Sequence, residues 1–291
     1  MTTPVNKTDP ALAAALISQW AARADLDFIQ KDLQRRGKDR SRLTVADLAN
    51  YDQLHAGQLT ATRDFAAWVG IPDSARVIDL GAGLGGAARL LAADHGCKVA
   101  AVELSGPLHD TGVVLTGWLG LTPLVDHRCA DLLADAGGDT GPITFDLVWL
   151  QHVDMHVPDK GALYARVASH LAKGGRGVWH DWLAGPGGAP HYPMPWSDEG
   201  DLSYLSLPDT FREDTRQAGL DLGRLEVIAE RTHGWFARTH GGLRRALEKL
   251  PTNAARRRAR YTALATRIEN VLRNLDEQRL IPFYGEASLP M

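Results

Sequence analysis

Short apolar runs alternate with helical patterns through the middle of the chain. The apolar runs fall at 76–80, 98–103, 124–129, 145–150 and 177–182. The stretches at 87–95, 108–119 and 160–171 repeat apolar residues every three or four positions, which is typical of amphipathic helices. Strands and helices that alternate in this way form a parallel sheet covered by helices on both faces.

The segments on either side of this alternation are mostly helical. Helical spacing precedes it at 11–36 and 45–68, with a weak point at Gly57, and follows it at 208–218 and 235–275, with a break at Pro251. Two further strands are predicted at 224–230 and 280–289, which brings the sheet to seven strands. Between the predicted strand at 177–182 and the predicted helix at 208–218, residues 186–195 contain four prolines and predict a loop, because proline cannot donate to a strand ladder.

The composition is that of an ordinary folded protein. Of 291 residues, 32 are Lys or Arg and 35 are Asp or Glu, so the formal charge of −3 gives no reason to expect nucleic acid or an anionic membrane as a partner. The arginine run at 256–260 is expected to be a solvated helix face. Two cysteines exclude a disulfide framework. We see neither a leader sequence nor a long apolar run, which predicts a cytoplasmic protein.

Tryptophan is the compositional exception, because its eight residues outnumber the six tyrosines and the six phenylalanines. Four of them lie close together in the chain, at Trp149, Trp179, Trp182 and Trp196. Aromatic faces bind flat rings and cationic amines. We expect Trp182, at the end of a strand, and Trp196, in the proline-rich loop, to line a ligand pocket.

The strongest chemical signal is Asp79-Leu-Gly-Ala-Gly-Leu-Gly-Gly86, which follows the first predicted strand. Glycines permit a tight turn and the close approach of a ligand, and the helix that follows offers free N–H groups. Glu103 ends the next strand, where a carboxylate can accept both ribose hydroxyls of a nucleoside. The sequence therefore predicts a cofactor that contains a nucleoside.

Two classes of cofactor fit this spacing. Gly81, Gly83 and Gly86 also satisfy the pattern of nicotinamide dinucleotide enzymes. Asp79 argues against them, since at 4 Å and an effective dielectric near 20 it would repel a pyrophosphate by on the order of 4 kcal/mol. The ammonium and sulfonium groups of S-adenosylmethionine would instead be attracted.

From about residue 51 to residue 183 the chain resembles class I S-adenosylmethionine-dependent methyltransferases. Besides the glycine-rich stretch, the resemblance rests on Ala130-Asp131-Leu132 and on the stretches 145–153 and 171–177. The stretch 79–89, together with Trp149-Leu-Gln-His152 and His156-Val-Pro-Asp-Lys160, resembles glycine, sarcosine and dimethylglycine methyltransferases, and more broadly ubiquinone and tocopherol methyltransferases.

The resemblance implies an α/β fold with a Rossmann-like, mostly parallel seven-stranded sheet and helices on both faces. An N-terminal helical cap would occupy 1–70. The cofactor-binding core would occupy 71–291 and carry a lid loop at 184–206 and a late helical insertion at 235–277.

The same resemblance assigns cofactor-binding roles. Asp131 would accept the adenine amino group and Leu132 would present its backbone. Tyr51 and His55 lie in a segment that closes over the cofactor in relatives. The full predicted set is Asp79, Gly81, Ala82, Gly83, Glu103, Leu104, Asp131, Leu132, Gln151, Tyr51 and His55.

The acceptor should lie beyond the fourth and fifth strands, because ligands of open parallel sheets bind at the carboxyl ends of the strands. His152 is the leading candidate for a general base, and His156 and His180 are further catalytic candidates. An amine or a thiolate would need orientation alone. We expect no metal site, since these histidines and Asp181 have no recognised ligand spacing, and adjacent strand residues such as His180 and Asp181 point to opposite faces.

The predicted activity is methyl transfer from S-adenosylmethionine to a small-molecule acceptor, an amine or an aromatic or secondary metabolite, which leaves S-adenosylhomocysteine. The predicted substrate-binding residues are Gln53, His152, Trp182, His191, Tyr192 and Trp196. Leu150-Gln-His-Val153 stands where enzymes that methylate nucleic acid bases resemble one another in an Asn/Asp-Pro-Pro-Tyr/Phe sequence, which argues against that substrate. The alternatives are non-methylating chemistry with the same cofactor, a nicotinamide-dependent oxidoreductase, and a non-enzymatic binding module. A homodimer is compatible with each of them.

Overall fold

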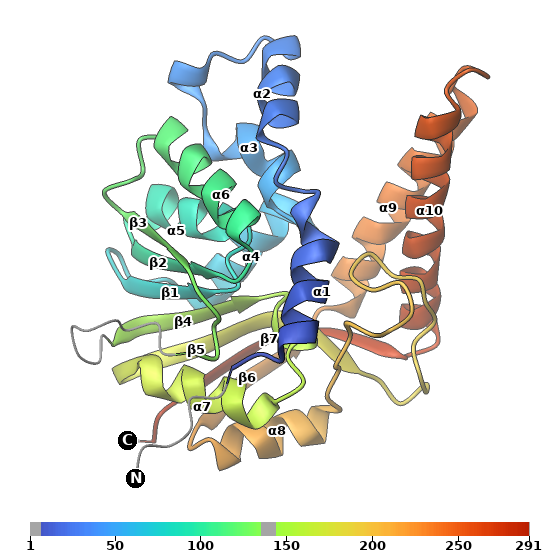
Figure 1. Ribbon diagram of the computed structural model, residues 1–291. Coiled ribbons are helices and arrows are strands. Elements are labelled where there is room, and N and C mark those ends of the chain that lie inside the picture. The colour runs from blue at the N-terminus through green and yellow to red at the C-terminus, as the bar shows by residue number, and fades with distance from the viewer. Residues whose placement is uncertain (1–6, 135–143, 291) are drawn as a thin grey trace.

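A seven-stranded sheet forms the centre of the protein in the computed structural model, which describes residues 7–134 and 144–290 (Figure 1). Its strands are β1 (Arg76–Leu80), β2 (Lys98–Glu103), β3 (Val125–Cys129), β4 (Phe145–Gln151), β5 (Leu171–Ala184), β6 (Asp221–Val227) and β7 (Leu280–Ser288). They follow the order β3-β2-β1-β4-β5-β7-β6, and β7 alone is antiparallel to its neighbours. The predicted seven-stranded, mostly parallel sheet is confirmed.

Helices cover both faces of this sheet. The helices α4 (Gln58–Val69), α5 (Gly86–His95) and α6 (Gly106–Trp118) lie on one face, and α7 (Lys160–His170) and α8 (Pro208–Gln217) lie on the other (Figure 1). Because strand residues alternate between faces, Val77 and Trp149 pack with Phe65 of α4, whereas Ile78 and Trp179 belong to the core beneath α7. Trp149 and Trp179 are therefore core residues, fully buried on opposite faces.

The N-terminal cap contains more helices than predicted. They are α1 (Pro10–Ala21), α2 (Leu26–Arg35), the 3₁₀ helix η1 (Arg40–Arg42), α3 (Val45–Asp52) and α4. The single helix predicted over 11–36 is wrong, because the Asp25 carboxylate accepts a hydrogen bond from the Phe28 N–H and starts a new helix. The helix predicted over 45–68 likewise breaks before α4, where Gly57 has a φ of +78°.

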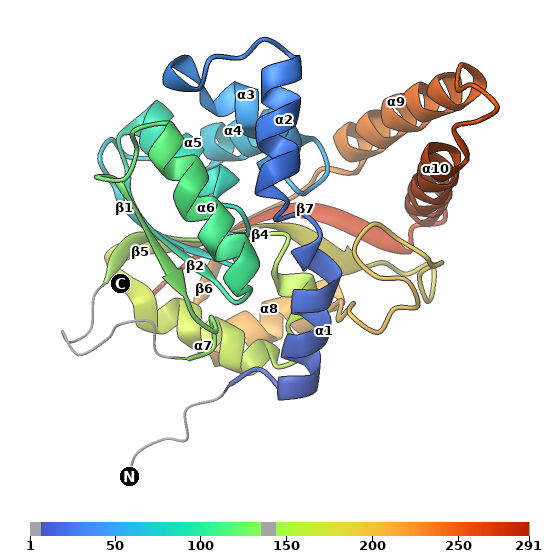
Figure 2. The ribbon, with the colours of Figure 1, turned by 45° about the horizontal axis from the view of Figure 1, so that its top comes forward.

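Two long helices, α9 (Ala229–Glu248) and α10 (Ala255–Asp276), project side by side from the sheet (Figures 1 and 2). We call them the α9–α10 hairpin. It begins earlier than the predicted insertion at 235–277, since β6 ends at Val227. No side chain from 241 to 264 is buried, so the arginine run at 256–260 lies on an exposed part of the hairpin. Within the described ranges no helix combines the length and the apolar character needed to cross a membrane.

Candidate functional site

A cavity of about 710 Å³ opens where β1, β2 and β4 end. Its floor is formed by the turn after β1, the end of β2 and the segment after β4. Its walls come from α1, from the loop that follows β5 and from the base of the α9–α10 hairpin. Most of the predicted cofactor and acceptor residues therefore converge on one space, as expected for the carboxyl edge of a parallel sheet.

The glycine-rich turn shapes the floor of this cavity. Gly81 has a φ of +77°, and a Cβ built there would lie 2.5 Å from Cγ2 of Val153, so both conformation and space require glycine. The Gly83 N–H donates to the Glu103 carboxylate over 2.8 Å, and the Ser105 N–H donates to its other oxygen over 2.8 Å. These bonds hold Glu103 against the turn, and burial raises the pKa of its carboxyl group.

Asp79 is buried beside this turn with an incomplete set of partners. Its side chain is 2% exposed, and no described residue donates a hydrogen bond to its Oδ2. Burial, followed by the nearby Glu103 carboxylate, raises the pKa of Asp79 to about 7. A cationic ligand group would relieve both effects, so the turn fits a ligand with an ammonium or sulfonium better than one with a pyrophosphate.

Asp131 lines the cavity close to the segment that precedes α1. The Thr8 N–H and hydroxyl donate to its two carboxylate oxygens over 2.6 and 2.9 Å, and the Leu133 N–H donates over 2.9 Å. Thr8 thus occupies the position expected for an adenine amino group, and the adenine contact of Asp131 stays a prediction. Ala82, Leu104 and Leu132 also line the cavity, and their cofactor contacts stay a prediction.

A buried polar network supports the middle of the cavity floor. The Thr62 hydroxyl donates to the Gln53 side-chain oxygen over 2.6 Å and lies 3.1 Å from the His55 Nε2. The Gln151 amide nitrogen lies 3.2 Å from this hydroxyl and 2.9 Å from the His180 Nδ1. Gln53, His55 and Gln151 face the cavity, whereas His180 is not among its lining residues.

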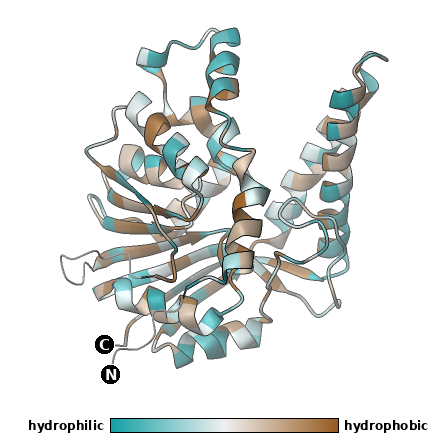
Figure 3. Ribbon diagram, in the orientation of Figure 1, coloured by the Kyte–Doolittle hydropathy of each residue, from teal (hydrophilic) through white to brown (hydrophobic). Residues whose placement is uncertain are grey.

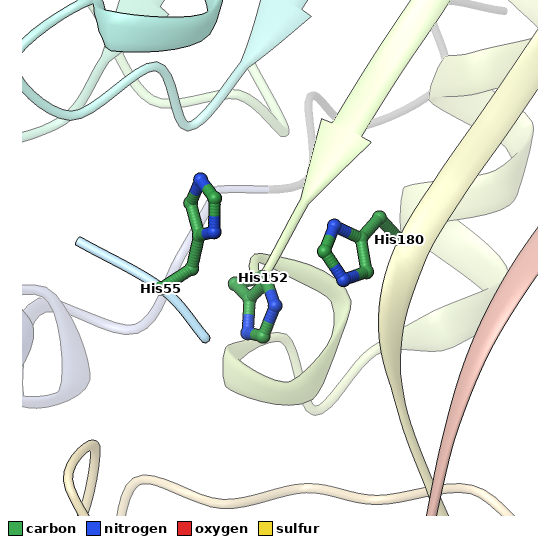
Figure 4. Close-up of side chains that lie close together, drawn as sticks. All are labelled: His55, His152 and His180. Carbon is green, nitrogen blue, oxygen red and sulfur yellow. The ribbon is translucent and has the colours of Figure 1, made fainter. Parts of the chain in front are cut away.

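His55, His152 and His180 bring three imidazoles together (Figure 4), with nitrogens within 4.8 Å of one another. Burial lowers the pKa of each, to about 4 for His55 and well below the ordinary value for the other two, so all three are neutral near pH 7. The metal ligands considered from the sequence were His152, His156, His180 and Asp181. In the structure His55 joins His152 and His180, whereas His156 and Asp181 are not part of this cluster. Asp181 indeed points to the other face, where it accepts from the N–H groups of residues 153 and 154.

His152 and His156 present opposite hydrogen-bonding groups. The Trp182 indole N–H donates to the His152 Nδ1 over 3.1 Å, so a neutral His152 carries its proton on Nε2 and is a donor there. The His156 Nδ1–H donates to the Leu202 carbonyl over 2.7 Å, so its Nε2 keeps a lone pair, to which no described residue donates. Burial lowers the pKa of His156 to about 4. His156, and not His152, therefore has the free lone pair that a base requires.

The backbone of His152 is also unusual, with a φ of +58° directly after β4. A non-glycine residue in the left-handed region is uncommon and is found most often where the site requires it. Because of the Trp182 bond, an ion that binds the Nε2 of His152 would have to displace the proton from that nitrogen.

Four predicted site residues lie outside the cavity lining. The Tyr51 hydroxyl donates to Asp32 on the outer side of the cap, so its predicted cofactor role is not supported. His191 is held against α10 by hydrogen bonds from its N–H to Asn274 and from its ring to Glu277. Tyr192 packs in the apolar core beside α10, and His180 lies beneath the floor. Loop residues turn toward α10 here, which the sequence alone does not reveal.

Aromatic side chains form the wall opposite the glycine-rich turn. Trp182 and Trp196 stack with ring centroids 5.2 Å apart, and both line the cavity, while their contact with a substrate stays a prediction. The wall is completed by Trp20 of α1 and by Trp235 and Phe236 of α9, which the sequence analysis did not include. The sequence showed that α1 is apolar, but it did not show that this helix faces the cavity.

The turn, Asp79 and Glu103 define a nucleoside-cofactor site on an open α/β sheet. The family described as "Methyltransferase domain" matches residues 51–249, and the chain belongs to this family.

Curated relatives match the same region. The chain is 32% identical over 181 residues to a sarcosine/dimethylglycine N-methyltransferase of Halorhodospira halochloris, which covers 61% of each chain. It is 28% identical over 143 residues to a probable chloroplastic tocopherol O-methyltransferase of Oryza sativa subsp. japonica, covering 47% of this chain and 39% of that protein. The chain thus spans about three fifths or less of the length of these relatives.

Solved structures share the fold at lower identity. Phosphoethanolamine N-methyltransferase 2 of Haemonchus contortus, solved with phosphomonomethylethanolamine and S-adenosylhomocysteine, superposes with a TM-score of 0.68 at 19% identity, covering 87% of this chain and 59% of that one. Geranyl diphosphate C-methyltransferase of Streptomyces coelicolor A3(2) superposes with a TM-score of 0.63 at 17% identity, covering 84% and 82%. At these identities the likeness shows the fold.

Proposed function

We propose that this protein transfers a methyl group from S-adenosylmethionine to a small-molecule acceptor and releases S-adenosylhomocysteine. The observation that carries the proposal is the buried Asp79 carboxylate, which lacks a partner at Oδ2 and lies beside the glycine-rich turn of a methyltransferase-family chain. The curated relatives named above carry names of N- and O-methyltransferases, which supports the same reaction class.

The residues of the cavity floor would hold the cofactor, which supplies an electrophilic methyl group on its sulfonium. Asp79 attracts the ammonium and Glu103 accepts hydrogen bonds from the ribose hydroxyls. Asp131 and Leu132 border the space for the adenine. The close approach at Gly81 and Gly83 lets the backbone contact the ligand directly.

His156 and His152 would act on the acceptor. A bond forms between the acceptor atom and the methyl carbon while the carbon–sulfur bond breaks and its electron pair stays on sulfur. The proton of the acceptor goes to the Nε2 of His156, which is neutral near pH 7. His152 donates from its Nε2 and orients the acceptor against Trp182.

Calorimetric titration tests the proposal. S-adenosylhomocysteine should bind saturably and with one ligand per chain, whereas NAD⁺ should give no comparable heat. Binding of NAD⁺ in place of S-adenosylhomocysteine, or of neither, would contradict the proposed cofactor.

A further inference from the structure

We propose that the acceptor is a hydrocarbon-rich molecule with an extended apolar or aromatic part, and not a short zwitterion such as a methylated glycine. The inference rests on the proposed methyl transfer and concerns the half of the cavity away from the glycine-rich turn. We call this half the acceptor chamber. It is bounded by α1, Met155, Trp182, Trp196 and the base of the α9–α10 hairpin.

Charge is distributed unevenly along the cavity. The carboxylates of Asp79, Glu103 and Asp131 lie at the cofactor end. Among the described lining residues the cations are Lys7, next to the Thr8 that bonds Asp131, and Arg23, which lies beyond the end of α1. Neither cation makes a hydrogen bond or an ion pair with His152 or His156, and Lys160, whose charge acts on His156, is already bonded to the carboxylate and the carbonyl of Asp154.

A carboxylate between His152 and His156 would therefore meet neutral imidazoles and a lysine that is already paired with Asp154. The imidazoles there are neutral, since burial holds the pKa values of His152 and His156 far below the ordinary value. A buried carboxylate that finds neither a cation nor several donors is strongly disfavoured. In a short zwitterion the carboxylate lies only a few bonds from the reacting nitrogen, so it would be buried beside these neutral imidazoles.

The chamber wall offers apolar surface instead. α1 is an apolar helix that is described throughout its length, yet it has no buried side chain. Its residues Leu12, Leu16 and Ile17 line the cavity and are only half-buried, and Figure 3 shows brown shades along this helix. They lie on one helix face, because residues four apart are neighbours. No described part of the protein buries this face fully, and a hydrocarbon ligand in the cavity would cover it.

The opposite wall has the same character. Trp235 and Phe236 of α9 face the cavity, and Leu264 of α10 is 37% exposed at its rim. An acceptor with its reacting atom near His156 can thus extend between α1 and the base of the hairpin in contact with apolar side chains on both sides.

A homologous series of ligands tests the inference. Protein saturated with S-adenosylhomocysteine would be titrated calorimetrically with 4-alkylphenols and N-methylalkylamines of increasing chain length, beside sarcosine and dimethylglycine. We expect the affinity to increase about three- to fourfold for each added methylene until the chamber is filled, with no saturable binding of the two zwitterions. Affinities independent of chain length, or tight binding of the zwitterions, would overturn the inference.

Leu16→Gln provides the matched test in the protein. Because α1 contributes no buried side chain, this change should leave the fold and the affinity for S-adenosylhomocysteine unchanged, yet weaken the longest alkyl ligands at least fivefold. The control Ala15→Gln alters an exposed neighbour that does not line the cavity and should have no effect. Equal affinities of the two variants for the longest alkyl ligands would contradict the proposed acceptor chamber. Failure of the wild-type protein to bind S-adenosylhomocysteine would instead contradict the proposed function.

Discussion

The raised pKa of Asp79 predicts that the affinity for the cofactor depends on pH. Its carboxyl group has a pKa raised to about 7, first by burial and then by Glu103. A ligand ammonium binds the ionised form preferentially, so binding lowers this pKa and releases a proton. The affinity must then increase with pH up to the free-state pKa and level off above it.

The magnitude follows from the ionised fraction of the carboxyl group. With a pKa of about 7, roughly one Asp79 in ten is ionised at pH 6 and roughly nine in ten at pH 8. The affinity for S-adenosylhomocysteine should therefore increase about tenfold across this range, which corresponds to about 1.4 kcal/mol.

Calorimetry at pH 6, 7 and 8, in two buffers with different ionisation enthalpies, measures both the affinity and the proton release. At pH 6 the heat should depend on the buffer, and at pH 8 this dependence should disappear. The control Asp79→Asn cannot titrate, so its affinity should be weaker at pH 8 and constant with pH. A wild-type affinity that is constant from pH 6 to pH 8, with heats that do not depend on the buffer, would refute the reasoning.

Three further predictions concern the base, acid stability and the turn. His156→Gln should lower kcat by about 10²- to 10⁴-fold with unchanged S-adenosylhomocysteine affinity, and His152→Gln should lower it less; a larger loss for His152→Gln would return the base to that residue. Since the pKa values of the buried His55 and His156 are lowered from 6.5 to about 4, the unfolded state takes up protons that the folded state does not between these values. The free energy of unfolding, measured with urea, should decrease as the pH falls through this range, by up to about 3 kcal/mol per histidine, and a flat profile would contradict the burial of neutral imidazoles. In Gly81→Ala the new Cβ would lie 2.5 Å from Val153, so this change should lower the free energy of unfolding by about 2–4 kcal/mol. The control Gly120→Ala has a φ of +67° but open space around it and should lower it by only about 1–2 kcal/mol. Equal decreases for the two variants would contradict the predicted clash.

The parts of the fold that depend on local pattern could be predicted from the sequence. The strands, the glycine-rich turn and the position of Glu103 follow from short apolar runs and from residues within one strand–turn–helix unit. Breaks between helices were harder to predict from the sequence, because the start of α2 depends on a single capping carboxylate, that of Asp25.

Side-chain direction in the loops could not be predicted. His191 and Tyr192 belong to the proline-rich loop, as expected, but Asn274 of α10 and Glu277, which directly follows this helix, hold His191 away from the cavity. Those partners lie more than 80 residues along the chain.

The choice of base also depended on distant partners. The sequence favoured His152, which directly follows the fourth strand. Only the hydrogen bonds from the Trp182 indole and to the Leu202 carbonyl show which nitrogens of His152 and His156 are free. The aromatic wall likewise combines α1 with α9, which lie some two hundred residues apart in the chain.

Transfer of a labelled methyl group tests the central claim most directly. The protein would be incubated with S-adenosylmethionine that carries a trideuterated methyl group and with an apolar phenol or amine that fills the acceptor chamber. Mass spectrometry should find the intact trideuterated methyl on the acceptor, together with one equivalent of S-adenosylhomocysteine. Consumption of the cofactor without label in the acceptor, or no consumption although the acceptor is bound, would contradict the account.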